Sequence, residues 1–194
     1  MSDQHIILSL YEMSQTVFTT QELRLLFPLL KQRELQNKLY YAIQTGKIQT
    51  VRRGVYVKKK YNSFELANKL YTPSYISFET VLSKEGIIFQ SESLIRVASY
   101  LTREITVDNH TISYRTIPKE VLTNAQGIQS ITHASIATKE RAFLDAVFLY
   151  KDYHFDSLRP LNWDVVKTLT PIYHTKAFQD RVNKYYQLYI EDHA

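Results

Sequence analysis

The chain has 194 residues, 44% of them apolar, and a net charge of +5, which is enough for one large domain or two small ones. It contains no cysteine, which excludes disulfides, thiolate zinc sites and a cysteine nucleophile, and we expect the reducing cytoplasm as its location. No segment approaches the roughly 20 apolar residues of a membrane span, and the start lacks the basic region and cleavage site of a signal peptide, so we expect no membrane contact.

Three helices are predicted in the first third of the chain. The first falls in DQHIILSLYEM, where apolar residues recur at helical spacing. The second falls in FTTQELRLLFP, where Thr19 and Glu22 have the spacing of a capping box and Pro28 ends the helix. The third falls in KQRELQNKLYYAIQTG and closes at Gly46, although its start has no Ser, Thr, Asp or Asn cap.

The third predicted helix has an apolar face and a polar face. The apolar face consists of Leu35, Leu39, Ala42 and Ile43. The opposite face has no acidic residue and consists of Arg33, Gln36, Asn37, Tyr40, Tyr41 and Gln44. Asn and Gln side chains can bind adenine through two hydrogen bonds, and Arg can bind guanine or phosphate, so this face is suited to nucleic acid.

A cationic β-hairpin is predicted directly after the third helix. KIQTV and VYVKK are its strands, joined by Arg52, Arg53 and Gly54, with glycine where a tight turn needs positive φ. Residues 1–61 contain ten Lys and Arg against four Asp and Glu, whereas residues 62–194 contain fourteen against fifteen. Three helices, a hairpin and this excess of positive charge predict a winged helix-turn-helix that binds DNA.

The remaining two thirds predict a mixed domain. A connector helix with its linker is expected at 62–74, and an α+β domain is expected at 75–194. Its predicted elements are a strand and helix in SYISFETVLSKEGI, a strand in SLIRVASY, a hairpin in REITVDNHTISYRTIP, a helix in ATKERAFLDAVFLY capped by Thr138, and two helices in the tail. The expected fold class is therefore α+β: an N-terminal winged helix-turn-helix followed by a mixed α+β C-terminal domain ending in helices.

No catalytic, metal or cofactor site is predicted from the sequence. None of the four glycines forms a phosphate-binding loop or a nucleophile elbow, and no Asp or Glu stands two positions before a Lys as in common nucleases. Asp152, His154 and Asp156 alternate as metal ligands on a strand could, but an exposed loop is the favoured interpretation. Arg141 and Asp145, four residues apart on a predicted helix, are expected to form a weak surface ion pair.

A series of short motifs resembles the AbiEi-type antitoxin family of bacterial abortive-infection operons. The motifs are VRRGVYV, YISFETVLSKEGII, YRTIP and IATKERAFLDAV, and the resemblance runs from about Thr19 to Tyr150. It implies an autorepressor that binds inverted repeats of double-stranded DNA in its own promoter and counters a co-encoded nucleotidyltransferase-type toxin, without needing to touch it. The front domain would bind DNA and the second would act as the antitoxin.

The resemblance and the residues together give a set of DNA-contacting candidates and no catalytic residue. The candidates are Arg33, Gln36, Asn37 and Tyr40 on the third helix, with Arg52, Arg53 and Lys58 on the hairpin. No long interface helix or heptad forces dimerisation, so we expect a monomer or a weak dimer.

Three alternative functions remain open at this point. The chain could be a stand-alone winged-helix regulator. It could sequester a toxin directly, because its tail is rich in tyrosines and aromatic residues are enriched at interfaces. It could also be a degenerate nuclease fused to a DNA-binding domain, which the missing nuclease dyad disfavours.

Overall fold

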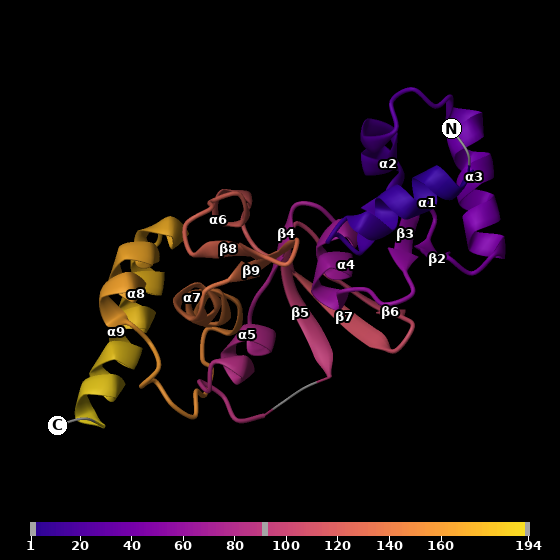
Figure 1. Ribbon diagram of the computed structural model, residues 1–194. Helices are drawn as coiled ribbons and strands as arrows, with labels where there is room; N and C mark the ends of the chain where they lie inside the picture. Colours follow the sequence, from indigo (N-terminus) through magenta and orange to yellow (C-terminus); the bar gives the residue numbers. More distant parts are fainter. Residues whose placement is uncertain (1–2, 91–92, 193–194) are drawn as a thin grey trace. The chain divides into compact units, whose positions relative to one another are not determined.

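The computed structural model describes residues 3–90 and 93–192 and divides the chain into two compact units, Met1–Leu70 (unit 1) and Tyr71–Ala194 (unit 2). The protein is of mixed α+β structure, and the last described element is a helix, as predicted (Figure 1). The division between the units falls within the predicted connector at 62–74, directly after its helix, which belongs to unit 1.

Unit 1 combines helices with a small antiparallel sheet. Its elements, in chain order, are α1 (Asp3–Glu12), β1 (Val17–Thr19), α2 (Thr20–Leu26), α3 (Gln32–Gln44), β2 (Ile48–Arg52), β3 (Val55–Lys58) and α4 (Ser63–Leu70). In the described residues the sheet has the strand order β1-β3-β2. The short strand β1 was not predicted, and it pairs antiparallel with β3 in the register Phe18 to Tyr56.

The core of unit 1 lies where the helices meet the sheet. The predicted apolar face of α3 is buried, with Leu35 and Leu39 each 2% exposed and Ala42 fully buried. These side chains pack in one cluster with Ile6, Leu10, Phe18, Leu23 and Ile48. The amphipathic pattern that predicts α3 therefore also fixes which of its faces meets the rest of unit 1.

Buried polar contacts join α4 to the rest of unit 1. The Glu65 side chain is fully buried and accepts hydrogen bonds from Thr16, at 2.9 Å from the backbone N and 2.6 Å from Oγ1. Lys69, one turn later, lies 3.3 Å from Glu65 and 2.8 Å from Glu22 on α2. A buried carboxylate is stable only when it is paired and hydrogen-bonded, which explains why α4 is part of this unit.

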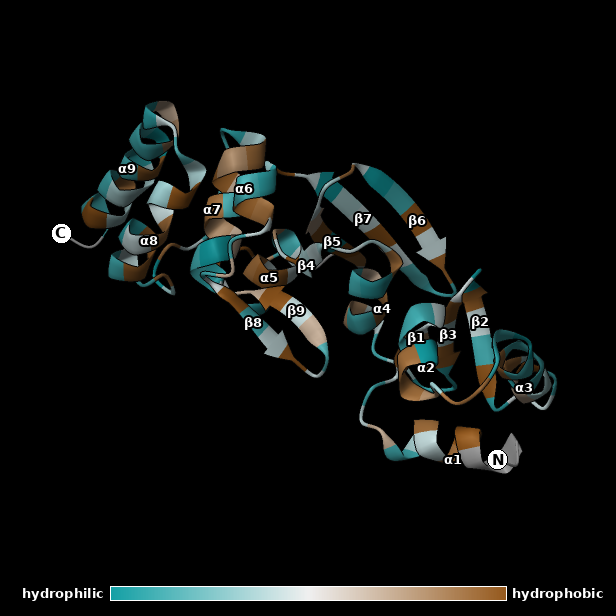
Figure 2. Ribbon diagram, turned by 90° about the horizontal axis from the view of Figure 1, so that it is seen from above, coloured by the Kyte–Doolittle hydropathy of each residue, from teal (hydrophilic) through white to brown (hydrophobic). Residues whose placement is uncertain are grey.

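Unit 2 is built on a mixed sheet with the strand order β6-β7-β5-β4-β9-β8 in the described residues. The bounds of its strands are β4 (Ser74–Ile76), β5 (Leu94–Ser99), β6 (Arg103–Val107), β7 (His110–Thr116), β8 (Ile128–Ile131) and β9 (Ala134–Ala137). The pairs β5–β7 and β4–β9 are parallel, and the other neighbours are antiparallel. The predicted hairpin is β6–β7, along which polar and apolar residues are interspersed (Figure 2), whereas the hairpin β8–β9 was not predicted.

Helices complete unit 2, with α7 at its centre. The helical elements are α5 (Glu79–Lys84), α6 (Lys119–Leu122), α7 (Lys139–Tyr150), α8 (Trp163–Leu169), a 3-10 turn (Thr170–Tyr173) and α9 (Lys176–Glu191). Helix α7 contacts β9 and α5 and also α8 and α9. Its predicted cap is confirmed, because the Thr138 hydroxyl accepts a hydrogen bond from the Arg141 N at 3.3 Å.

The expected surface ion pair of α7 is instead the buried polar centre of unit 2. Arg141 and Asp145 are both fully buried, with Nε 3.6 Å from Oδ1. The Asp145 carboxylate also accepts hydrogen bonds from Tyr75 (3.1 Å), Ser77 (2.7 Å) and Tyr173 (2.7 Å). The pairing itself is confirmed, but its expected surface position was wrong. The spacing on α7 carries no information on the partners that other segments bring, Tyr75 on β4 and Tyr173 in the 3-10 turn.

The aromatic residues of the tail are largely engaged within unit 2. Tyr173 is 2% exposed, and the Tyr185 hydroxyl donates to the carbonyl of Tyr153 at 2.8 Å. Trp163 lies against the rings of Tyr186 and Tyr189, with centroid separations of 5.1 and 5.4 Å. These contacts account for the tyrosines by internal packing. Among the described helices, none is long and apolar enough to cross a membrane.

Candidate nucleic-acid interface

Helix α3 begins and ends at identifiable local signals. Its N-cap is Lys31, whose backbone N donates to the Glu34 carboxylate at 3.0 Å, so the glutamate supplies the capping contact that the lysine side chain cannot. The helix ends at Gln44, and Gly46 follows with φ +64°. Glycine adopts this left-handed conformation without steric cost, so the chain leaves the helix and enters β2.

The polar face of α3 is exposed, as predicted. Arg33, Gln36, Asn37 and Tyr40 are all exposed, and Tyr40 keeps 65% of its surface in contact with solvent. The exposed ring and hydroxyl of Tyr40 are therefore accessible for contact with a nucleotide. Four of the seven predicted DNA-contacting residues therefore share one accessible helix face.

The hairpin β2–β3 turns at Arg53 and Gly54, and its tip is cationic. Arg52 and Arg53 are exposed, and Gly54 has φ +80°. The strands pair antiparallel with an irregularity between Thr50 and Arg52, and such a bulge increases the local twist of a hairpin. The two arginines thus stand at the tip of a short hairpin whose register is irregular next to them.

A hollow of about 420 Å³ lies between α2, α3 and this turn. Gln36 from α3 and Arg53 from the hairpin both line it, so the structure brings together residues from the two predicted contact regions. Its other polar lining residues are Thr20, Arg24, Gln32 and Tyr56. Sequence reasoning missed Arg24, which is exposed on α2, because the capping signal of α2 reveals nothing about which of its residues face the hairpin.

Lys58 does not belong to this interface, which corrects one predicted site residue. It is 8% exposed, and its Nζ donates to the Met13 carbonyl at 2.6 Å. The ammonium also lies 5.6 Å from the centroid of the Tyr11 ring and 5.8 Å from that of Phe18. Burial lowers the pKa of Lys58, opposed by the negative charge of Glu65. A lysine held inward in this way cannot contact a phosphate backbone.

The acidic residues near the interface are engaged within unit 1. Although burial opposes the change, the hydrogen bond and charge of Lys69 lower the pKa of Glu22. Glu65 is buried against Thr16, and Glu34 caps α3. Glu22 and Glu65 are therefore committed to contacts within unit 1, whereas Glu34 is exposed, like the arginines on α3, α2 and the hairpin tip.

The alternating acidic and histidine residues after α7 form a loop, as expected. Asp152 and His154 are exposed, and Asp156 accepts a hydrogen bond from the Phe89 N at 2.7 Å. His154 Nε2 lies 3.9 Å from Asp156 Oδ1. Within residues 3–90 and 93–192, no three His, Cys, Asp or Glu side chains are grouped so that they could hold a metal ion.

Comparison with known protein families finds no match, and comparison with curated proteins finds no significant match.

Proposed function

We propose that unit 1 is a winged helix-turn-helix that binds double-stranded DNA and regulates transcription, with α3 in the major groove and the β2–β3 hairpin along a phosphate backbone. The observation that carries the proposal is the element order α1-β1-α2-α3-β2-β3 with β3 paired between β1 and β2. In helix-turn-helix domains the second helix of the motif enters the major groove, and here α3 presents an exposed face without acidic residues.

The side chains divide into two chemical roles. Gln36 and Asn37 carry amides that can bind an adenine edge through paired hydrogen bonds, so they are the candidates for base recognition. Arg24, Arg52 and Arg53 are exposed, and Arg24 and Arg53 line one hollow with Gln36 of α3. Guanidinium groups bind phosphate through parallel hydrogen bonds. The hollow shared by Gln36 and Arg53 supports one continuous surface on which both roles could operate.

Substitutions in the two groups separate affinity from specificity. Changing Arg52 and Arg53 together to Ala should weaken binding to every DNA sequence and make the dependence on salt shallower. Changing Gln36 or Asn37 to Ala should instead erode the preference for the native site by ~1–3 kcal/mol. The matched control replaces Lys119 and Lys176, two exposed cations of unit 2, by Ala.

Binding is measured on the DNA upstream of the gene and on a scrambled duplex of the same length. If the double arginine variant binds the native duplex as tightly as the unchanged protein, the hairpin is not a phosphate contact. If the Gln36 and Asn37 variants keep the full preference, α3 does not recognise the bases.

The resemblance to AbiEi-type antitoxins extends the proposal to an antitoxin and autorepressor that counters a co-encoded nucleotidyltransferase-type toxin. Co-expression tests the antitoxin proposal separately from DNA binding. The 194-residue chain should restore growth to cells that express the co-encoded toxin. Residues 71–194 should restore growth as well if unit 2 is the antitoxin. Co-purification of chain and toxin would favour direct sequestration. Failure of the chain to restore growth, combined with preferential binding to the native duplex, would leave a stand-alone regulator.

A further inference from the structure

Three leucines are exposed where α2 ends and the turn to α3 begins, within five consecutive residues (Figure 1). Leu25 is 74% exposed, Leu26 38% and Leu29 85%, whereas the neighbouring Leu23 and Phe27 are buried in the core of unit 1. Single exposed leucines are common on protein surfaces, but several together mark a surface that binds another molecule. We call Leu25, Leu26 and Leu29 the leucine turn.

Positive charge borders the leucine turn. Residues 24–33 contain three exposed cations, Arg24, Lys31 and Arg33, and no acidic residue. Two such turns placed against each other would bring like charges together, which disfavours a contact of the leucine turn with itself. The leucine turn is therefore suited to a surface that combines apolar and acidic side chains.

Unit 2 carries a groove with this composition. The groove has a volume of about 420 Å³ and lies between the α7–α8 loop and the C-terminal part of α9. Its lining includes the acidic residues Asp152, Asp156 and Asp192 and the apolar or aromatic residues Leu158, Tyr185 and Leu188. None of the described residues that line it is a lysine or an arginine. We call it the acidic groove.

The walls of the acidic groove are held by contacts between its two sides. The Tyr185 hydroxyl on α9 accepts a hydrogen bond from the Tyr153 N at 2.9 Å and donates one to the Tyr153 carbonyl at 2.8 Å. The rings of Tyr185 and Phe155 meet edge to face, with their centroids 5.2 Å apart. A partner therefore meets walls that are already in place, which lowers the entropy cost of binding.

Two large apolar side chains are exposed at the acidic groove. Leu188 lines it and is 51% exposed. Phe89 is 73% exposed and lies beside it, because its backbone N donates to the lining residue Asp156, at 2.7 Å from Oδ2. Covering these side chains with the leucines of a partner would remove apolar surface from water on both sides of the contact.

We propose that the acidic groove of one copy of the chain receives the leucine turn of a second copy. The leucines cover Leu188 and Tyr185, and the cations that border the turn lie against the carboxylates of the groove. The two surfaces match in apolar character and are opposite in charge. Because every copy carries both surfaces, two copies can form the contact twice and close into a dimer. The inference goes beyond the proposed function and holds whether or not unit 1 binds DNA.

Sedimentation equilibrium of the full chain, from about 1 to 200 µM, tests the proposal. One chain has a mass of 22.8 kDa, and the weight-average mass should rise toward twice this value with a Kd in the micromolar range, because the contact is small. Raising the salt from about 50 to 500 mM should weaken the association about threefold or more, because charge pairs at a surface are screened. Docking of the leucine turn into the groove of its own chain would leave the mass constant, which would contradict the proposal.

Substitutions at exposed positions link the association to the two surfaces. Leu29→Ser and Leu188→Ser should each weaken it about tenfold or more, because each removes an apolar side chain from the contact. The matched controls are Leu8→Ser on α1 and Ile131→Ser on β8, which change exposed apolar residues outside both surfaces and should leave the association unchanged. Asp192→Asn, at the acidic groove, should make the salt dependence shallower.

A mixture of the two weakened variants tests whether the contact joins unlike surfaces of different copies. The Leu29→Ser chain keeps an intact groove, and the Leu188→Ser chain keeps an intact leucine turn. The mixture should therefore associate at least about threefold more tightly than either variant alone, because one contact of unchanged composition can form between the two chains. Labelling one variant with a fluorophore lets sedimentation velocity follow the mixed species.

Three results would overturn the proposal. The first is a chain that stays at the mass of a single copy up to about 200 µM at low salt. The second is association that Leu29→Ser and Leu188→Ser leave unchanged. The third is a mixture of these variants that associates no more tightly than either variant alone.

Discussion

The carbonyl of Gly54, at the tip of the β2–β3 hairpin, accepts two hydrogen bonds from Thr20, the first residue of α2: one from the backbone N at 2.9 Å and one from Oγ1 at 3.3 Å. The hairpin turn is thereby tied to the helix that precedes α3. Because Gln36 and Arg53 line one hollow beside this contact, the position of the arginine relative to the α3 face depends on it. Thr20 thus acts as a positioning residue for the proposed interface.

Replacing Gly54 tests how tightly this contact is built. A Cβ at Gly54 would lie 3.1 Å from Thr20 Oγ1, and the residue has φ +80°, so Gly54→Ala should lower the free energy of unfolding of unit 1 by about 1 kcal/mol or more. Gly46→Ala is the matched control, because Gly46 has φ +64° and nothing within 4 Å of the added Cβ. Urea unfolding should give the larger loss at Gly54. Equal losses would mean that backbone strain, rather than the Thr20 contact, sets the cost.

Lys58 should behave differently from Arg53 although both were predicted to bind DNA. Lys58→Met keeps the length of the buried side chain but removes the hydrogen bond to the Met13 carbonyl, so the free energy of unfolding should fall by about 1–3 kcal/mol. The salt dependence of DNA binding should stay as it is. Arg53→Ala should do the reverse, with stability unchanged and the slope of log K against log salt reduced by about one. A reduced slope in the Lys58 variant would show that Lys58 does contact DNA.

The buried Arg141 should be among the most sensitive positions of unit 2. It donates to the carbonyls of Val121 (2.6 Å) and Gln126 (2.8 Å) and is paired with Asp145. Arg141→Met would leave the buried carboxylate without its cation and should cost about 3–5 kcal/mol of unfolding free energy. Lys176→Ala, on the exposed side of α9, should change it by less than about 0.5 kcal/mol. Chemical denaturation followed by tryptophan fluorescence measures the unfolding free energy of both variants. A cost below about 1 kcal/mol for Arg141→Met would contradict the role of Arg141 as the buried cation that pairs with Asp145.

Stability should fall at alkaline pH because of buried tyrosines. Burial, together with the negative charge of Asp145, raises the pKa of Tyr75 and of Tyr173 well above the ordinary value of 10.0. Below pH 10 both states of the chain keep these protons, so the stability is fully present. Above pH 10 only the unfolded chain releases them, and the free energy of unfolding should fall by about 1.4 kcal/mol per pH unit for each tyrosine.

Urea unfolding between pH 8 and pH 11 measures this loss. Tyr173→Phe should lower stability at pH 8, because Asp145 loses a donor at 2.7 Å, and should make the alkaline decline shallower. Tyr100→Phe, at an exposed tyrosine, should leave the decline as it is. Stability that stays constant up to pH 11 would show that these tyrosines ionise in the folded protein.

Local signals in the sequence predicted a large part of the fold. The faces of α3 follow from a single amphipathic pattern, and the start of α7 follows from the Thr138 cap. The β6–β7 hairpin follows from alternation within a dozen residues. In each case the information lies within a few turns or strand residues of the element, so one stretch of sequence is sufficient to predict it.

The elements that were missed depend on contacts between distant segments. Strand β1 has three residues and exists because Phe18 pairs with Tyr56. The β8–β9 turn places Thr132 and His133 at positive φ, which neither residue type signals. The buried state of Asp145 depends on Tyr75 and Tyr173, which lie 70 and 28 residues away.

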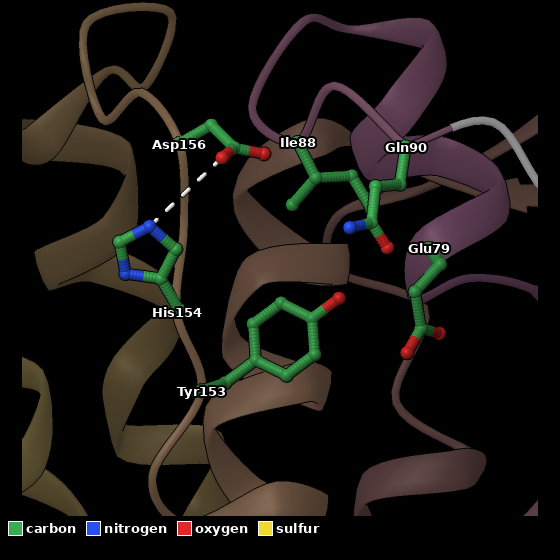
Figure 3. A pocket seen from close by; sticks show the side chains of 6 residues that line it. All are labelled: Glu79, Ile88, Gln90, Tyr153, His154 and Asp156. Atoms are coloured by element: carbon green, nitrogen blue, oxygen red, sulfur yellow. Dashed lines mark ion pairs between the residues drawn. The ribbon is translucent and has the colours of Figure 1, made fainter.

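One part of the candidate site could likewise be predicted from local sequence, and the other part could not. Exposure of Arg33, Gln36 and Asn37 followed from the helical period, whereas the inward position of Lys58 depended on the Met13 carbonyl 45 residues earlier. Another hollow of unit 2 was not predicted either, because its lining residues come from three segments with no shared motif: Glu79, Ile88 and Gln90, and Tyr153, His154 and Asp156 (Figure 3).

The most direct test of DNA binding by unit 1 is a salt series of equilibrium binding to the native upstream duplex and to a scrambled duplex. Four exposed arginines, Arg24, Arg33, Arg52 and Arg53, predict tighter binding to the native duplex and a slope of log K against log salt of about −4. Absence of binding to either duplex at low salt, or equal affinity with a slope near zero, would contradict the account.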